Sequence, residues 1–77
     1  MDDYRKRKLH WKCRRGLLEL DIVLERFMQA NALQEKEADS FDELLELPDN
    51  DLLDIVMGRS DTYQPHLNDL VARLRAA

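Results

Sequence analysis

The sequence predicts a small all-α protein, a compact bundle of five helices. Apolar residues recur at three- and four-residue spacings, and no segment shows the strict alternation typical of a β-strand. Helix start and stop signals divide the chain into five segments. With 77 residues there is room for one small hydrophobic core, so we expect a single domain spanning residues 1–77.

The first helix is expected over residues 2–14 and is strongly basic. Acidic residues at its start suit the helix dipole, and four consecutive basic residues follow them. Tyr4 and Trp11 fall on one side of this helix, whereas Leu9 and Cys13 fall nearly opposite. The helix should therefore contact the body of the protein with one side only, leaving the other side for a partner.

The second helix, expected over residues 17–33, carries the main apolar stripe. The stripe has the i, i+3, i+4, i+7, i+8 spacing of an amphipathic helix and consists of Leu20, Val23, Leu24, Phe27 and Met28. Leu18 and Ile22 fall beside it, on a strip next to Glu19. We expect both to pack under the first helix because a small domain needs the buried area; exposure for binding is the alternative.

A short third helix is predicted to begin at a capping box. Ser40 and Glu43 have the Ser-x-x-Glu form, in which each side chain satisfies a backbone N–H at the helix start. Pro48 should mark the end of this helix. Its buried face would consist of Phe41, Leu44 and Leu45. The polar stretch 34–39 before it is expected to be a solvated loop.

Two more helices complete the prediction. Residues 49–51 offer a cap and a negative first turn for the fourth helix, and Gly58 suits its C-terminal stop. The inward residues of this helix would be Leu52, Ile55 and Val56. Pro65 fits the first turn of the fifth helix, after a linker at 61–64. The fifth helix would bury Leu67, Leu70, Val71 and Leu74.

Charge is distributed very unevenly along the chain. The net charge is −4, but residues 1–16 carry +5 and residues 17–77 carry −9. This split favours oriented contact with a partner bearing both signs, and it argues against nucleic-acid binding because the acidic part repels phosphates. A helix-turn-helix module also fits poorly, since the basic cluster lies in the first helix. Alternatively, the basic helix folds onto the chain's own acidic helices, and both explanations can hold.

The chain lacks the features of an exported or membrane-spanning protein. Cys13 is the only cysteine, so no intrachain disulfide can form and a reducing compartment is expected. No apolar run approaches the roughly 20 residues that span a bilayer. The N-terminus has neither a secretory signal nor the composition of a transit peptide. We therefore expect a cytoplasmic protein without membrane insertion, from a bacterium; a mature form from which an extension has been trimmed is the alternative.

Residues that could support catalysis or bind a cofactor are few. His10 and Cys13 form the only close pair of potential metal ligands, and His66 would have to join them from far along the chain. Gly16 and Gly58 are the only glycines, which excludes a glycine-rich phosphate loop. Cys13 has no base to activate it; its neighbours Lys12 and Arg14 would favour a thiolate, but a buried position in the helix is the commoner role. We expect no catalytic residue, no metal site and no stably bound cofactor.

The most informative segment is residues 14–21, at the junction between the first two helices. It places Gly16 between two arginines, Arg14 and Arg15, and the carboxylates of Glu19 and Asp21. Glycine exposes the backbone and lets another molecule come close, while Arg15 and Glu19 flank it with opposite charges. This pattern is typical of a docking surface. The alternative is an ordinary helix boundary with charged ends.

Residues 10–21 resemble the signature region of the SdhE family, the succinate dehydrogenase assembly factors. Members carry an Arg-Gly-x-x-Glu motif, which Arg15, Gly16 and Glu19 match here. The resemblance covers most of the chain, because members are also small, acidic and helical, with a basic first helix and a Trp before the Arg-Gly pair. In the fourth helix this chain has Ile55 where many members have an aromatic residue.

The resemblance implies an assembly factor, not an enzyme. Members bind the flavoprotein subunit of succinate dehydrogenase, and often that of fumarate reductase, and promote covalent attachment of FAD to a histidine of that subunit. Arg15 would then pair with a client carboxylate or carbonyl and Glu19 with a client cation, while Gly16 permits close approach. An antitoxin-like or regulatory module with another protein partner is the alternative, and recovery of a flavoprotein by pull-down would favour the first.

Further residues would extend this surface along the first helix, namely His10, Trp11 and Arg14. Trp11 is as well suited to the core as to an interface, because Trp fills space and also anchors contacts. Asp21 is expected either on the partner-binding surface or as a bridge to the basic first helix.

Overall fold

The computed structural model describes residues 3–77, and this part of the chain is helical without strands. The elements are α1 (Asp3–Lys12), α2 (Leu18–Ala30), α3 (Glu35–Leu45), α4 (Asp49–Val56), the 3₁₀ turn η1 (Pro65–Leu67) and α5 (Asn68–Ala76). The predicted all-α class with five α-helices is confirmed. The predicted start of the first helix at Asp2 lies outside the described residues.

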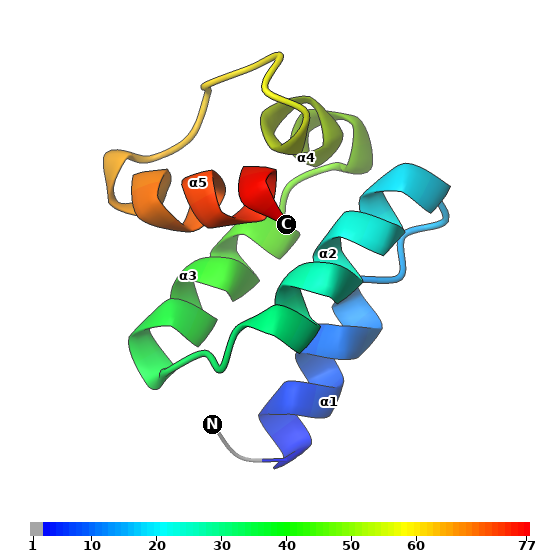
Figure 1. Cartoon of the computed structure of the whole chain (residues 1–77), viewed down its shortest axis with the longest axis vertical. Helices are drawn as coiled ribbons and strands as arrows, with labels where there is room; N and C mark the ends of the chain where they lie inside the picture. Colours follow the sequence, from blue (N-terminus) through cyan, green and yellow to red (C-terminus); the bar gives the residue numbers. More distant parts are fainter. Residues whose placement is uncertain (1–2) are drawn as a thin grey trace.

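The first three helices lie side by side with alternating direction, so α1 and α3 run parallel with α2 antiparallel to both (Figure 1). Helices α4 and α5 lie across the end of this three-helix unit at which α1 and α3 finish (Figure 1). Helix α5 packs against α2, α3 and α4. No helix within residues 3–77 is long and apolar enough to cross a lipid bilayer.

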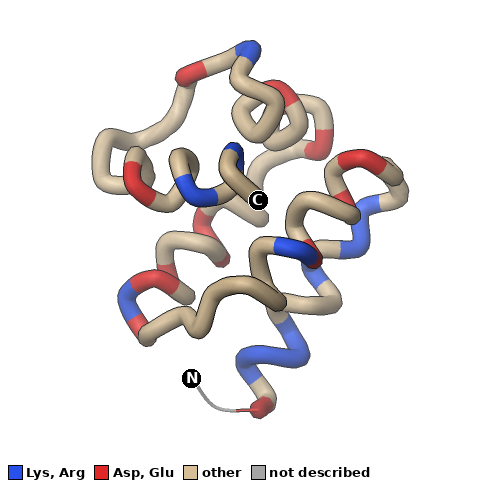
Figure 2. Tube along the Cα trace, in the orientation of Figure 1, with Lys and Arg blue, Asp and Glu red and all other residues tan. Residues whose placement is uncertain are grey.

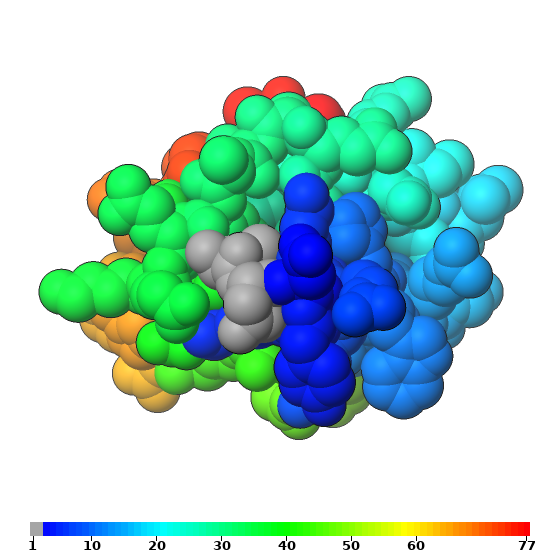
Figure 3. Space-filling model, turned by 90° about the horizontal axis from the view of Figure 1, so that it is seen from below, coloured from blue at the N-terminus to red at the C-terminus, as the bar shows by residue number. Residues whose placement is uncertain are grey.

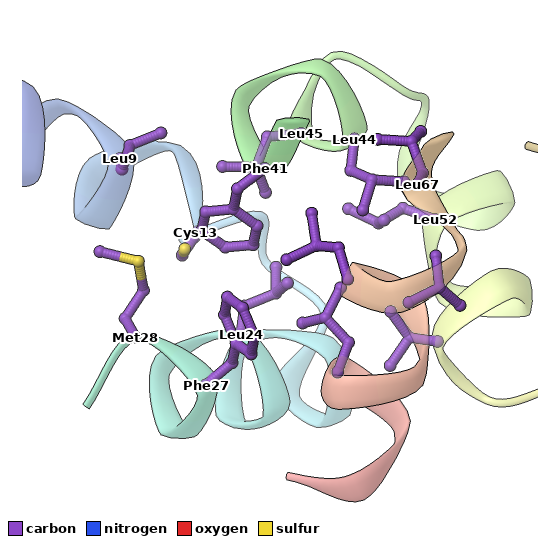
Figure 4. Packing of buried hydrophobic residues seen from close by; sticks show 14 of the residues in the cluster. Leu9, Cys13, Leu24, Phe27, Met28, Phe41, Leu44, Leu45, Leu52 and Leu67 are labelled. Carbon is purple, nitrogen blue, oxygen red and sulfur yellow. The ribbon is translucent and has the colours of Figure 1, made fainter. Parts of the chain in front are cut away.

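The core is one cluster of buried apolar side chains to which all five α-helices contribute (Figure 4). Phe27 of α2 and Phe41 of α3 meet within it, with ring centroids 5.0 Å apart and planes inclined by 46°. The stripe predicted for α2 is confirmed, since Leu20, Leu24, Phe27 and Met28 are buried and Val23 is half-buried. The inward residues predicted for α3, α4, η1 and α5 are buried as well.

Helix α3 begins six residues earlier than the capping box at Ser40 predicted. The helix starts at Glu35, and the residue that caps it is Gln34 instead of Ser40. The side chain of Glu37 accepts the backbone N–H of Gln34 at 3.3 Å and so satisfies a donor at the helix start. The stretch 34–39 expected to be a loop is therefore almost entirely helical. Ser40 lies inside the helix, so the predicted capping role of Ser40 is wrong.

Helix α4 begins without the side-chain cap that the sequence predicted. Its first turn is preceded by Pro48, which makes no side-chain capping bond, and the carboxylate of Asp49 is directed to Arg15 instead. Gly58 ends the helical segment with a φ of +78°, as predicted for a C-terminal stop. Pro65 opens η1, which leads into α5, so the predicted start of the last helical segment is confirmed.

Helix α1 contacts the body of the protein with one side, as its pattern predicted. Leu9 and Cys13 are buried, whereas the side chains of Tyr4 and Trp11 remain 71% and 73% exposed. Seen from the end at which the chain begins, α1 forms the surface between α2 and α3 (Figure 3). One side of the helix is therefore available to a partner.

The rest of the α1 contact is electrostatic. Two cations of α1, two turns apart, each bridge carboxylates spaced i, i+4 on α3 or just after it. The contacts are Arg5 with Glu35 and Asp39, and Lys12 with Asp42 and Glu46. Hydrogen bonds to Asp42 and Glu46 raise the pKa of Lys12. The basic helix thus folds onto the chain's own acidic residues (Figure 2). This contact is one of the two explanations offered above for the uneven charge.

Candidate functional site: the junction between α1 and α2

The turn between α1 and α2 depends on Gly16. Its φ of +83° lies in the left-handed region, which favours glycine. Apart from Gly16 itself and its two neighbours in the chain, no heavy atom of the described residues lies within 4 Å of the position that a Cβ would occupy at Gly16. The backbone is therefore open to solvent at this point, and nothing within the described part of the chain prevents another molecule from approaching it closely.

Asp21 holds this turn in place from the first turns of α2. Its Oδ1 accepts the backbone N–H of Arg15 at 2.9 Å, and its Oδ2 accepts that of Gly16 at 3.2 Å. The carboxylate thus contacts the backbone of the turn instead of bridging to a basic side chain of α1. Asp21 supports the shape of the junction, and among residues 3–77 it forms no ion pair with a basic side chain of the first helix.

Arg15 turns inward and joins three helices. Its Nε donates to Asp49 Oδ1 at 2.7 Å, at the start of α4. Its Nη1 donates to the carbonyl oxygens of Leu45 at 2.8 Å and Lys12 at 3.3 Å, at the ends of α3 and α1. Its Nη2 donates to the carbonyl oxygen of Leu47 at 2.5 Å. With the side chain only 13% exposed, these bonds hold the guanidinium within the fold.

The remaining residues predicted for the site lie mostly on the surface. Arg14, Gly16 and Glu19 are exposed, and Trp11 is 73% exposed, so its alternative role as a core residue is wrong. His10 is half-buried. We call the four exposed residues Trp11, Arg14, Gly16 and Glu19 the junction face. The structure thus divides the side chains of the predicted segment between the surface and the interior.

Leu18 and Ile22 were predicted to pack under α1, and the structure shows otherwise. Leu18 is 76% exposed and Ile22 is 41% exposed. The area argument failed because α1 buries only one residue within the helix, Leu9, and meets α3 through ion pairs instead. The two side chains add apolar area beside the junction face, as expected for a surface that binds another protein.

Two open hollows adjoin the junction, and Trp11 and Arg14 line both of them. The first hollow is also lined by Lys12, Arg15 and Asp49, and the second by Arg7, His10 and Glu25. Their volumes are about 250 and 320 Å³. Cavities that enclose small ligands are typically about 300–1,000 Å³. The first hollow is smaller than this range, and the second lies at its lower end.

The described residues offer little for metal binding or covalent chemistry. No group of three or more His, Cys, Asp or Glu side chains within residues 3–77 is placed to hold a metal ion. His66 instead lies with its Nε2 2.9 Å from Glu43 Oε2. Burial raises the pKa of the Cys13 thiol to about 12, and the nearby charge of Glu25 adds to this effect. A thiol in this state is a poor nucleophile.

Sequence reasoning missed the part that Asp49 plays at the junction. Asp49 follows Arg15 by 34 residues, and the same separation relates Lys12 to Glu46 and Arg5 to Asp39. This repeated separation was visible in the sequence and reflects the parallel alignment of α1 with α3. It could have been used to match the cations with their carboxylates.

Comparison with known proteins gives a consistent result. Residues 7–77 match the family model Sdh5, described as flavinator of succinate dehydrogenase. An FAD assembly factor SdhE from Ralstonia nicotianae is 42% identical over 97% of this chain and 85% of its own length. Proteins of the same name from Coxiella burnetii and Legionella pneumophila are 37% and 39% identical, over 90% and 97% of this chain and 87% and 96% of theirs.

Proposed function

Because the chain belongs to the family of succinate dehydrogenase flavinators, we propose that it is an assembly factor for the flavoprotein subunit of that enzyme. It binds this subunit, the client, and promotes the covalent attachment of FAD to it. The observation that carries this function is the family match over residues 7–77, supported by relatives named FAD assembly factor that align over most of both chains. The same surface would serve fumarate reductase as a second client.

The junction face supports a role in binding instead of catalysis. It combines an exposed indole, a cation, a carboxylate and an open stretch of backbone at Gly16. Aromatic side chains and arginines anchor protein interfaces most often. FAD stays with the client throughout, so this chain needs no resident cofactor and is not itself an enzyme. We place this step in the cytoplasm, where a free thiol such as Cys13 stays reduced.

The chain acts on flavin attachment by favouring one conformation of the client. A bound protein shifts a conformational equilibrium only by its difference in affinity for the two states. If the junction face binds only the client state in which FAD and its acceptor histidine are in contact, the attachment becomes effectively unimolecular and faster. Glu19 would pair with a client cation, and Gly16 would allow the two backbones to approach each other.

Covalent flavin in the client provides the test. The client is detected by flavin fluorescence in a denaturing gel, using cells that lack this protein and cells complemented with the wild type or with Gly16→Arg. Gly58→Arg is a matched control, because both glycines have a positive φ and open space at the Cβ position. Each substitution should cost about 1–2 kcal/mol of backbone strain, but only the one at Gly16 lies on the junction face.

We expect the wild type and Gly58→Arg to restore the flavin band and Gly16→Arg to leave it weak. Equal loss in both variants would mean that strain, not the junction face, explains the defect. A flavin band that is unchanged when the protein is absent would contradict the proposed function for this client. The same experiment with fumarate reductase then decides whether that enzyme is the client.

A further inference from the structure

We infer that the two adjacent arginines have separate roles: Arg15 positions the junction from inside the fold, and Arg14 is the cation that contacts the client. This inference rests on the proposed function and deepens it. The family motif includes Arg15, and the sequence alone suggested that Arg15 reaches the client. The contacts of the two side chains reverse that assignment.

The guanidinium of Arg15 is already engaged in hydrogen bonds within the fold, and the charges around it favour this position. Its guanidinium donates to backbone carbonyls at the C-terminal ends of α1 and α3, where the helix dipoles favour a cation. It also pairs with Asp49 at the start of α4. Four hydrogen bonds use all three of its nitrogens. A client group could bind this guanidinium only by displacing bonds that are already made and mostly withdrawn from water.

The bonds of Arg15 also determine where Gly16 lies. Asp21 holds the backbone N–H groups of both residues from the α2 side, and the Arg15 side chain holds the same turn from the α3 and α4 side. We call Arg15, Asp21 and Asp49 the junction clamp. Because the turn is held from both sides, the open backbone of Gly16 is presented in one orientation before the client arrives, which lowers the entropy cost of binding.

Arg14 has the opposite character. Its side chain is exposed and makes no hydrogen bond or ion pair to the residues that the structure describes. Together with Trp11 it lines both hollows beside the junction. An exposed cation next to an exposed indole suits a client surface on which an acidic side chain adjoins apolar ones. We therefore assign to Arg14 the client carboxylate that the sequence suggested for Arg15.

The positioning role of Arg15 can be tested in the free protein. Amide hydrogen exchange of Gly16 is measured in Arg15→Lys, in Asp49→Asn and in the control Arg75→Lys. Lysine keeps the charge but cannot reproduce the forked bonds of a guanidinium. Arg75 is a matched control because, like Arg15, it donates to backbone carbonyls and to a carboxylate, here those of Ile55, Ser60 and Asp61, away from the junction.

We expect Gly16 to exchange about tenfold faster in Arg15→Lys and severalfold faster in Asp49→Asn, since local opening controls exchange in a structured turn. Arg75→Lys should leave Gly16 unchanged. Unchanged exchange in both junction variants would overturn the positioning role of Arg15. Equal acceleration in the control would also overturn it, because the effect would then be a general loss of stability.

The division of roles is tested by affinity for the purified flavoprotein subunit. Arg14→Gln should weaken binding about tenfold without changing Gly16 exchange, and Arg14→Lys should recover most of the loss. Arg15→Lys and Asp49→Asn should each weaken binding, and the double variant should be no weaker than the poorer single variant, because both changes release the same clamp. Full additivity would overturn the clamp.

A direct contact between Arg15 and the client predicts a different pattern. Asp49→Asn would then free Arg15 for the client and leave the affinity unchanged or higher, and Arg14→Gln would have no effect. Either result overturns the inference while the flavoprotein still binds the wild type. Absence of wild-type binding contradicts the proposed function and the role of Arg14, whereas the exchange measurements still decide the role of Arg15.

Discussion

The carboxylate of Asp21 accepts the backbone N–H of Arg15 at 2.9 Å, six residues before it in the chain. A helix-start carboxylate thus fixes the turn that precedes its own helix, and the same side chain holds Gly16. The side chain of Arg15 is bound on the other side by the ends of α1 and α3 and the start of α4.

Asp21→Ala should therefore loosen the junction. Loss of two hydrogen bonds to a charged acceptor is expected to lower the free energy of unfolding by about 1–3 kcal/mol. Urea denaturation measures the change. Asp69→Ala is the control, because Asp69 is also an acidic residue in a helix first turn but is exposed. Equal losses in the two variants would show that a helix-dipole effect, not the bonds to the turn, explains the result.

Trp11 should contribute to binding and little to folding. Its side chain is 73% exposed, so Trp11→Ala should change the free energy of unfolding by less than about 0.5 kcal/mol. Because it is the only tryptophan, the fluorescence of the free protein should be that of a solvated indole. We expect the emission of Trp11 to shift to shorter wavelength when the client binds, provided that the client has no tryptophan of its own at the contact.

Tyr4→Ala is the control for that experiment, since Tyr4 is on the same helix and 71% exposed but lies away from the junction face. It should leave client affinity unchanged, whereas Trp11→Ala should weaken binding about tenfold or more, as removal of an interface anchor does. Similar effects of the two substitutions would argue for a contact along the whole of α1.

Glu37 should make stability depend on pH in the acid range. Its pKa is lowered by the backbone hydrogen bond from Gln34 and then by Arg73 of α5. A group whose pKa is lower in the folded state stabilises the fold above its unfolded pKa, near 4.3. This contribution disappears as the pH falls through the lower folded pKa. The wild type should therefore lose more stability than Glu37→Gln on acidification.

Urea denaturation of both proteins between pH 7 and pH 3 measures this difference. The difference between their free energies of unfolding should be largest near neutral pH and should disappear in acid. Glu43→Gln is a comparison variant, because it removes another carboxylate of α3, one that pairs with His66 of η1 and not with Arg73. Parallel curves for the wild type and Glu37→Gln would contradict the role of Glu37.

Cys13 should be unreactive while the protein is folded. With its pKa raised to about 12, its thiolate fraction at pH 8 is on the order of one in ten thousand, and the residue is buried. A disulfide reagent should label the unfolded protein in guanidinium completely and the folded protein only at the rate of unfolding. Rapid labelling of the folded protein would mean that α1 detaches readily.

High salt should loosen α1 before the other helices. Leu9 is the only buried residue within α1, and the ion pairs of Arg5 and Lys12 supply much of its remaining attachment to α3. Salt screens ion pairs that are partly exposed. Amide exchange in α1 should rise about two- to fivefold between 50 mM and 1 M sodium chloride. The amides of α5, which packs through Leu70, Val71 and Leu74, should change less.

Much of the fold could be predicted because α2, α4 and α5 each carry one clear apolar stripe. The start of α3 could not, since Ser40-x-x-Glu43 has the capping-box form, whereas Gln34, which precedes the helix in the structure, is not among the preferred cap residues. The earlier start prevails because it buries Ala38 and brings Glu35 and Asp39 to Arg5 of α1. These gains come from tertiary contacts, which a local pattern does not contain.

The candidate site was predicted as a segment but not as an arrangement. Residues 14–21 follow from the position of the glycine between opposite charges. Which of Arg14 and Arg15 turns inward depends on the link between α3 and α4, whose carbonyl groups and Asp49 reach Arg15 from more than thirty positions later. Adjacent arginines are equivalent in sequence, and only the packing of distant segments distinguishes them.

The parallel alignment of α1 and α3 also determines where the chain can change in length. Three cations pair with carboxylates that follow them by 30 or 34 residues, namely Arg5, Lys12 and Arg15. One residue inserted within α3 between Asp39 and Asp42 would turn Asp42 and Glu46 by about 100° around the helix, away from Lys12. The same insertion in the loop before Gln34 would leave the helix faces matched. Insertions and deletions in related proteins should therefore occur in the loops and be absent from the middle of α3.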